Sequence, residues 1–323
     1  MANGNTLVSR LGQVDTAGDA LALFLKQFTG EVLTAFSNTT VTMDKHMVRT
    51  IASGKSASFP VTGIAQAAYH TPGTNIADAA NGLLNQIKHA ERTISIDDLL
   101  IAATFIANLD EAMNHYDVRS IYSTELGTAL ALKMDGNVLR KFIKTARQAT
   151  PAYTGGPVGS VINAGATVAT TSSVLAAKIA QAAMVLDQKN VPGEGRFCFI
   201  RPEQYSLLTQ DTTVLDKQIG GSGSYSEGTV YKIAGVTLAK TNQIPSANEA
   251  SQATGDRNGY NGNYTDTVAL VAHKNAVGTV KLLDLAFESE YKIELQGTLM
   301  VAKYAVGHGE LRPECAVEIS KAA

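Results

Sequence analysis

The sequence predicts a protein that mixes helices and strands, of the α/β or α+β class. The strongest helical periodicity runs from Leu109 to Arg147, whereas Arg196–Ile200 and Thr267–His273 are apolar runs of strand length. Other helix and strand patterns alternate along the chain, as expected when both kinds of element pack around one core. With 323 residues the chain is long enough for about two domains.

The composition describes a nearly neutral chain. Hydrophobic residues make up 45%, charged residues 17%, and the formal net charge is -2. A surface that binds nucleic acid needs clustered Lys and Arg to displace counterions. The nearly neutral net charge therefore argues against a specific DNA-binding role. No apolar run reaches about 18 residues, and residues 1–16 are polar. We therefore expect neither a membrane helix nor a secretory signal, and a protein made in a cytoplasm.

The N-terminal region predicts a polar arm followed by an amphipathic helix over residues 19–36. Phe24, Phe28, Val32 and Phe36 recur at four-residue spacing and share one helical face. This apolar stripe needs a surface to bury against, either in the same subunit or in the next one.

Residues 52–90 predict an extended two-stranded arm. They lie between an extended segment, 46–51, and a run in which Ile94 and Ile96 alternate with polar residues. The intervening stretch is rich in Ala, Gly, Ser and Asn and has little regular pattern, which is unusual inside a compact domain. A lone two-stranded arm is only marginally stable, so it needs another chain to lie on.

The long helix predicted over residues 109–147 has suitable charges at its ends. Asp110 and Glu111 suit the first turn, Lys144 and Arg147 suit the last turn, and prolines and glycines from residue 151 onward stop it. The remaining chain is predicted to hold a helix over 171–189, a strand over 196–200, a helix beginning at 202, a flexible loop over 220–223, a strand over 231–238 with a turn at Gly235, a polar surface loop over 246–264, a strand over 267–273, an extended segment over 291–306, and a final strand over 315–319.

No catalytic or metal-binding pattern stands out. The six histidines form no i, i+4 pair and the chain has no CxxC, so we expect no metal, no cofactor and no enzyme activity. His115, Asp117 and Arg119 could form an acid–base pair, but a structural salt bridge is the favoured interpretation. The sequence at 220–224 lacks the remainder of a phosphate loop, and Gly307-His308-Gly309 predicts a tight turn after a strand. Cys198 and Cys315 lie far apart in apolar runs and are expected to be buried, reduced thiols.

Several groups of segments carry a resemblance to a known family. They are Ala20–Lys26 with Gly30–Phe36; His46–Arg49, Ser53–Ala57 and Phe59–Val61; Ala112–Ser120; Ala276–Leu282 with Asp284–Ala286; and Ala302–Ala305, Gly307–Gly309 and Leu311–Glu314. In this order they resemble the major capsid proteins of T7-like (autographivirus) podoviruses. Residues from about 150 to 267 match poorly, and there the expectation rests on the pattern alone.

The resemblance implies the α+β, HK97-like capsid fold, with an N-terminal arm, an extended E-loop hairpin, a P-domain with a long spine helix, and an A-domain. On this chain the expected boundaries are 1–40 for the arm, 41–51 and 91–154 for the P-domain, 52–90 for the E-loop, 155–284 for the A-domain, 285–310 for the returning P-domain strands, and 311–323 for a strand that closes the A-domain sheet.

The resemblance also implies a function. It predicts self-assembly as hexamers and pentamers into an icosahedral shell that encloses the double-stranded DNA genome of a phage, in the cytoplasm of the bacterial host. Expected partners are other copies of the chain, a scaffolding protein, a portal, and minor capsid or cement proteins. Two alternatives stay open at this point: an encapsulin-like compartment of the same fold, and a cytosolic α/β enzyme that binds a ligand at its glycine-rich loops.

Ten residues are the candidates for assembly contacts. The apolar candidates are Phe24, Phe28, Val32, Phe59, Val61 and Tyr69, and the charged candidates are Arg49, Lys55, Asp117 and Arg119. The arm helix and the E-loop supply the apolar anchors, and charge pairs fix the register. Lys55 is included for the isopeptide cross-links that some phage shells form, although no spacing supports that role.

Overall fold

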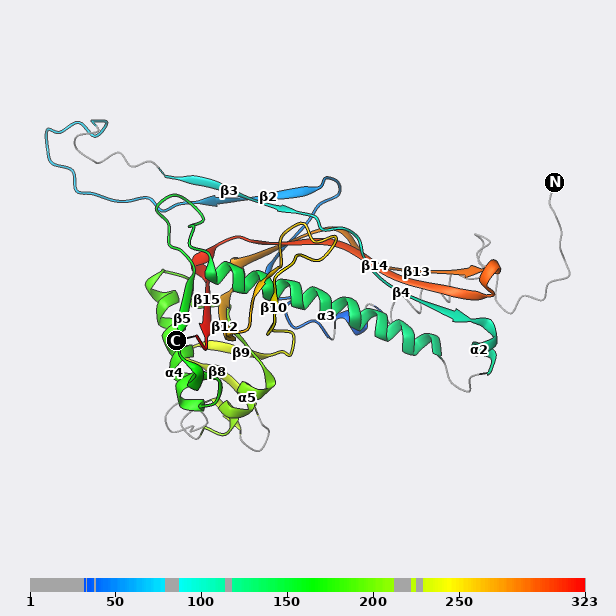
Figure 1. The fold of residues 1–323 in the computed structure, drawn as a ribbon. Helices are drawn as coiled ribbons and strands as arrows, with labels where there is room; N and C mark the ends of the chain where they lie inside the picture. Colours follow the sequence, from blue (N-terminus) through cyan, green and yellow to red (C-terminus); the bar gives the residue numbers. More distant parts are fainter. Residues whose placement is uncertain are drawn as a thin grey trace. The chain divides into compact units, whose positions relative to one another are not determined.

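The computed structural model describes residues 32, 34–37, 39–78, 87–113, 118–211, 222–224 and 229–322 (Figure 1). The chain divides into two compact units. Unit 1 comprises Met1–Thr39, Leu100–Ala131 and Leu285–Tyr304, and unit 2 comprises Thr40–Leu99, Leu132–Asp284 and Ala305–Ala323. Most of the predicted arm helix, His115 with Asp117, and residues 220–221 of the predicted flexible loop lie outside the described residues. The rest of that loop prediction is wrong, because residues 222–224 form a short strand that pairs antiparallel with residues 229–232.

The described elements confirm a mixed α+β fold. In chain order they are β1 (Met47–Thr50), β2 (Ser56–Thr62), β3 (His89–Ser95), β4 (Leu100–Ala107), α2 (Asn108–Met113), α3 (Val118–Arg147), β5 (Ser160–Asn163), α4 (Ser172–Gln188), β6 (Arg196–Ile200), α5 (Pro202–Thr209), β7 (Ser222–Ser224), β8 (Thr229–Ile233), β9 (Val236–Lys240), β10 (Asn248–Glu249), β11 (Gly262–Asn263), β12 (Thr267–His273), β13 (Val277–Lys292), β14 (Gly297–Glu310) and β15 (Ala316–Ser320). Short 3-10 turns join several of them.

The long helix was predicted as one element and is described as two. α2 and α3 cover the predicted range, with residues 114–117 outside the described part. Val138 and Phe142 lie in the part of α3 that belongs to unit 2, and both are buried. Lys144 and Arg147 lie in the last turn, as predicted. Gly127, a glycine inside α3, serves close packing in unit 1. A Cβ there would lie 2.6 Å from the carbonyl oxygen of Val32.

Two long strands dominate the four-stranded sheet, whose order is β1-β13-β14-β4. The sequence predicted part of β14 and missed β4. The β4 segment is rich in Ala, Leu and Ile and has no clear alternation of polar residues, so only its antiparallel pairing with β14 makes it a strand. The predicted turn at Gly307-His308-Gly309 is wrong. These residues lie inside β14, and a Cβ on Gly307 would lie 1.9 Å from the carbonyl oxygen of Ser95.

The second large sheet lies in unit 2 and has the order β5-β15-β12-β6-β9-β8-β7. β12 is buried throughout and pairs antiparallel with both β15 and β6. α4 packs against β15, β12 and β5 with its apolar face, which includes Leu175, Ile179 and Leu186. The turn predicted at Gly235 joins β8 to β9, and Ala234 and Gly235 both have positive φ, as a two-residue hairpin turn requires.

The polar segment 246–264 was predicted as a surface loop, and that prediction is wrong for its second half. Tyr260 and Tyr264 are buried, and β10 pairs with β11 across the segment. The two cysteines are free and buried, as predicted. Among the described residues, no helix has the length and hydropathy that crossing a membrane requires.

Candidate functional site

A projecting segment between β2 and β3 carries strongly exposed apolar side chains among the described residues of unit 2. β2 and β3 pair antiparallel from Ser56 with Ser95 to Thr62 with His89. Residues 63–88 then form the segment that we call the extension, of which 79–86 lie outside the described residues (Figure 1). Within it Ile64 is 72% exposed, Ile76 is 54% exposed and Tyr69 is fully exposed. Several large apolar side chains exposed on one projecting segment make it a candidate interaction site.

The base of the hairpin, in contrast, belongs to the core of unit 2. Phe59 is 8% exposed and lies in a cluster with Ile94, Ile96, Val280, Ala305 and Leu311, and Val61 is 3% exposed. Residues two apart on a strand share a face, so both side chains point inward while Pro60 between them is exposed. The structure thus uses these two candidates to anchor the hairpin to its own chain and leaves Tyr69 in solvent.

Arg49 also acts within the chain. Its guanidinium carbon lies 4.9 Å from the ring centroid of Phe59, and its Nη1 donates to the carbonyl oxygen of Ser58 at 2.5 Å. A cation over an aromatic face is attracted by the ring quadrupole. The side chain of Lys55 is exposed, and its carbonyl oxygen accepts a hydrogen bond from the backbone N–H of Ile96. Arg49 therefore fixes β1 against β2 at the base of the hairpin.

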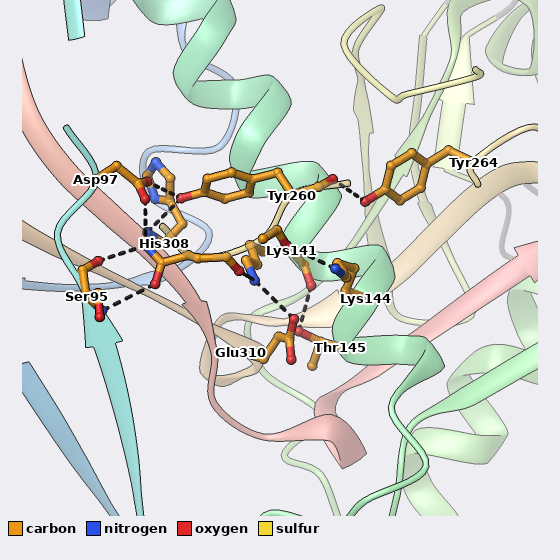
Figure 2. Close-up of polar contacts among 11 residues, drawn as sticks. Ser95, Asp97, Lys141, Lys144, Thr145, Tyr260, Tyr264, His308 and Glu310 are labelled. Atoms are coloured by element: carbon orange, nitrogen blue, oxygen red, sulfur yellow. Dashed lines mark hydrogen bonds and ion pairs between the residues drawn. The ribbon is translucent and has the colours of Figure 1, made fainter. Parts of the chain in front are cut away.

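A buried polar network holds the end of β3 (Figure 2). The Tyr260 hydroxyl donates to Oδ2 of Asp97 at 2.5 Å, and Nδ2 of Asn258 donates to Oδ1 of Asp97 at 2.9 Å and to the carbonyl oxygen of Ser95 at 2.7 Å. The backbone N–H of Ser95 donates in return to Oδ1 of Asn258. Burial and the neighbouring Asp97 carboxylate raise the pKa of Tyr260, so its hydroxyl stays protonated as a donor.

The same loop is tied to α3 and to β14. Lys141 donates from Nζ to the carbonyl oxygen of Asn258 at 2.5 Å and lies 3.2 Å from Oε1 of Glu310, while the His308 backbone N–H donates to the Tyr260 hydroxyl at 3.1 Å (Figure 2). Lys144 donates to the carbonyl oxygen of Gly259 at 3.0 Å. Residues 258–260 thus link the base of the hairpin to the C-terminal half of α3, and they fix where the hairpin leaves the body of unit 2.

Two histidines beside this network are buried and neutral. Burial lowers the pKa of His46 to about 4 and that of His308 to about 3, and their ring centroids lie 6.4 Å apart. The Nδ1 of His46 contacts the Thr42 carbonyl oxygen, and the Nδ1 of His308 contacts the Thr279 hydroxyl. Within the described ranges no three His, Cys, Asp or Glu side chains gather as metal ligands would.

The remaining candidates lie in unit 1 or outside the described residues. Val32 is fully buried, and the nearby Phe36 ring packs edge-on against Tyr304 at 5.9 Å. Arg119 donates to the Thr298 hydroxyl at 3.4 Å. Phe24, Phe28 and Asp117 fall outside the described residues. The end of the predicted arm helix therefore packs against its own unit.

Sequence reasoning missed Asp97, Asn258, Tyr260 and His308, which orient the hairpin. The available signal was an aromatic residue, Tyr260, within an otherwise polar and glycine-rich segment. Buried tyrosines usually find a hydrogen-bond partner, so such a residue points to a local anchor.

A long helix, a sheet with two long strands, and a hairpin that carries an exposed extension are the features of a phage capsid protein of the HK97-like fold. The solved capsid of cyanophage P-SCSP1u matches with a TM-score of 0.80 and 46% identity over 99% of both chains. The mature capsid of bacteriophage PhiM1 matches with a TM-score of 0.71 and 16% identity over 87% of this chain and 86% of that one. A virus-like particle from Pyrococcus furiosus shares the fold alone, with a TM-score of 0.58 and 13% identity over 92% of this chain and 99% of that one.

The sequence comparisons define the family. The model of the family "Gp10A-like: Major capsid protein" matches residues 58–320. The major capsid proteins of Escherichia phage T7 and Enterobacteria phage T3 are each 36% identical, over 98% of this chain and 97% of theirs. The chain belongs to this family of T7-like major capsid proteins. Its function is structural: it builds the capsid shell and is not an enzyme.

Proposed function

We propose that the chain assembles as hexamers and pentamers that close into an icosahedral shell around phage DNA, and that the extension of each copy lies across a neighbouring copy. The observation that carries this proposal is the exposure of Ile64, Tyr69 and Ile76 on one projecting segment. Identical subunits that contact one another head to tail generate closed rings when the rotation closes. An extension that leaves its own body is suited to such a contact.

The energetics favour many modest contacts. Burying one large apolar side chain contributes about 1.5–3 kcal/mol, so burial of Ile64, Tyr69 and Ile76 gives a useful but reversible contact. Each subunit of a shell makes several contacts at once, and their combined avidity exceeds that of any single contact. Reversible single contacts allow wrongly placed subunits to leave before the shell closes.

The proposed roles of the chain's segments follow the boundaries expected from the sequence. Residues 52–90 act as the E-loop, 41–51 and 91–154 with 285–310 as the P-domain, 155–284 as the A-domain, 311–323 as its closing strand, and 1–40 as the arm. The net charge of -2 supports a shell that encloses DNA without sequence-specific binding. A scaffolding protein, a portal and minor capsid or cement proteins are the proposed partners, with assembly in the host cytoplasm. Membership of the phage capsid family argues against the encapsulin-like and enzymatic alternatives.

Deleting residues 64–87 and joining the ends with a short Gly-Ser turn tests the proposal. We expect a soluble subunit with native circular dichroism that forms no particles in electron microscopy, because the hairpin core at Phe59 and Ile94 stays intact. The matched control replaces Ala65 and Ala68 by Ser, which alters the same segment but keeps its large apolar side chains. Complete shells from the deletion variant would overturn the proposal.

A further inference from the structure

One short segment of unit 2, residues 41–50, is held by few buried side chains. We call it the lead-in segment, because it leads toward the hairpin and ends in β1. β1 is an edge strand whose four residues are all exposed, and it pairs with residues 278–281 of β13. Such a strand opens easily, because few buried contacts oppose its release. Within the lead-in segment Thr42 and His46 are the buried residues, so its attachment depends on these two side chains.

A buried carboxylate and a histidine hold the lead-in segment. Asp135 on α3 is 1% exposed, and its carboxylate accepts from the backbone N–H of Val41 at 2.8 Å and from the Thr42 hydroxyl at 2.6 Å. The Thr42 carbonyl oxygen accepts from Nδ1 of His46 at 2.7 Å. Because a carbonyl oxygen only accepts, Nδ1 carries the hydrogen of the neutral ring and Nε2 has a free lone pair. Nε2 is buried without a hydrogen-bond partner in the described part of the chain, so a proton placed there would be unpaired.

A second buried histidine, His308 on β14, lies next to the first. The two ring centroids are 6.4 Å apart, and the ring of His308 lies 6.2 Å from that of Tyr260 (Figure 2). Nδ1 of His308 is 2.8 Å from the Thr279 hydroxyl. Over the described ranges no hydrogen bond joins either histidine ring to a carboxylate. The two rings are therefore packed as neutral groups.

The charges around the pair disfavour a proton on either ring. Lys281 opposes a positive charge on His46, and Lys141 opposes one on His308. Asp44 favours such a charge but is exposed, so solvent screens it. The charged and titratable groups that surround the pair are Asp44 and Lys45 beside His46, Asp135 and Lys141 on α3, Lys281 and Asp284 on β13, Asp97 and Tyr260 in the hairpin network, and Glu310 on β14.

We propose that His46 and His308 form a proton-operated latch, which holds the lead-in segment on α3 and β13 while both rings are neutral and releases it in mild acid with the rest of unit 2 still folded. Release exposes the ring of His46 to water, where a positive charge is solvated. The lead-in segment joins the expected arm to the hairpin, so the latch makes the connection between these two parts sensitive to pH. The latch is a property of the single subunit, and it holds or fails independently of the proposed function.

The direction of the pH effect follows from the two states of the latch. In the closed state burial, and to a lesser extent Lys281, lowers the pKa of His46 to about 4, whereas a solvated histidine titrates near 6.5. The open state therefore binds more protons, so the closed state is fully favoured above about pH 6.5 and is lost as the pH falls toward 4. Asp135 acts in the opposite direction, because burial raises its pKa and acid then favours the closed state. Asp135 is present in every protein compared below.

Hydrogen exchange of the free subunit tests the latch directly. Exchange would be measured by mass spectrometry at pH 7 and pH 5 and corrected for the intrinsic effect of pH on amide exchange. If opening exposes His46 alone, the opening equilibrium of residues 41–50 should rise roughly 20-fold between these pH values. Peptides from β12, which is buried throughout, should keep their protection. Unchanged protection of residues 41–50, or a loss in step with β12, would overturn the latch.

Two variants assign the pH effect to the histidine. His46→Asn keeps an amide that can donate to the Thr42 carbonyl oxygen but does not titrate, so the acid-driven opening of residues 41–50 should fall well below that of the wild type. The matched control is His89→Asn, because His89 on β3 is exposed and its loss should leave the acid effect unchanged. An acid effect of wild-type size in His46→Asn would overturn the proposal.

A third variant decides the case in which His46→Asn leaves residues 41–50 unprotected at both pH values. Lys281→Gln removes the cation that faces His46, so the closed state accepts a proton on the ring more readily. The acid-driven opening should therefore be smaller in this variant than in the wild type. In that case an acid effect equal to that of the wild type would show that the charge on His46 does not control the lead-in segment.

Discussion

The Tyr260 hydroxyl donates to Asp97 at 2.5 Å and accepts from the backbone N–H of His308 at 3.1 Å. One buried oxygen thus joins three segments: the corner after β3, the loop between β10 and β11, and β14. β3 is the returning strand of the hairpin, and it ends at this corner. The direction of the hairpin therefore depends on a side chain that is 163 residues away from Asp97 in the sequence.

Removing this hydroxyl should loosen the base of the hairpin. Tyr260→Phe leaves the Asp97 carboxylate without one donor and a buried N–H without its acceptor, so we expect a loss of about 1–3 kcal/mol in the free energy of unfolding. Urea denaturation of the free subunit measures it. Tyr122→Phe, at an exposed position, should change stability by less than about 0.5 kcal/mol. Equal stability of the two variants would show that the network does not hold the fold.

Acid should destabilise the subunit through its buried histidines. The folded-state pKa is about 4 for His46 and about 3 for His308, both below the unfolded value of 6.5. The unfolded state therefore binds more protons below pH 6.5, and stability falls as the pH drops from there toward these values. The loss is on the order of 2 kcal/mol per histidine at about pH 5.

The matched variant for this pH dependence is His46→Gln with His308→Gln. The exposed His70 and His89 remain in both proteins, so they contribute equally. Unfolding free energies measured between about pH 7.5 and pH 5 should show a shallower slope for the variant, whatever its absolute stability. An unchanged slope would mean that the two histidines do not remain neutral in the folded subunit.

The sequence predicted the elements whose signals are local. The alternation of Ile94 and Ile96 with polar residues marks the end of β3, which contains Ile94, Pro202 begins α5, and Gly235 lies in the turn from β8 to β9. The strand β4 was missed because its side chains carry no alternation, so pairing with β14 decides its conformation. Local propensity depends only on the residues of one segment, whereas strand pairing depends on the fold of the whole chain.

The candidate site was predicted in part for the same reason. The exposed extension and Tyr69 follow from the irregular Ala- and Gly-rich stretch, which cannot form a core of its own. Phe59 and Val61 look equally suitable as docking residues in the sequence, but the pairing of β2 with β3 turns them inward. Tyr260 in a polar segment indicates an anchor, but its partner Asp97 could not be predicted, because neither a polar loop nor a strand end shows its distant partner.

Gly307 should tolerate no side chain. In β14 its Cβ position lies 1.9 Å from the carbonyl oxygen of Ser95, and backbone cannot move away as a flexible side chain can. Gly307→Ala should therefore cost more than about 3 kcal/mol or prevent soluble expression. Gly193→Ala is the control, because nothing lies within 4 Å of its Cβ position. Thermal unfolding of both proteins distinguishes this close packing from the tight turn that the sequence suggested, since a turn glycine would accept Ala at a smaller cost.

The end of α3 should depend on a buried ion pair. Glu318 in β15 is fully buried, and its two carboxylate oxygens accept from Nε and Nη2 of Arg147 at 2.6 and 2.7 Å. These hydrogen bonds raise the pKa of Arg147, which therefore stays charged. Glu318→Gln keeps the shape but leaves the guanidinium, whose side chain is 33% exposed, without its counter-charge, so we expect a loss of about 1–3 kcal/mol in unfolding free energy.

The control for this pair is an ion pair at the solvent-exposed surface of the protein. Glu290 lies beside Lys292, and its side chain is largely exposed, so Glu290→Gln should cost less than about 1 kcal/mol because solvent screens the charges. Added salt should change the stability of the Glu290 pair and leave the Glu318 pair nearly unaffected, since ions do not reach a buried carboxylate. Denaturant unfolding at low and high salt measures both effects. A Glu318→Gln subunit as stable as Glu290→Gln would show that shape complementarity, rather than charge, joins α3 to the seven-stranded sheet.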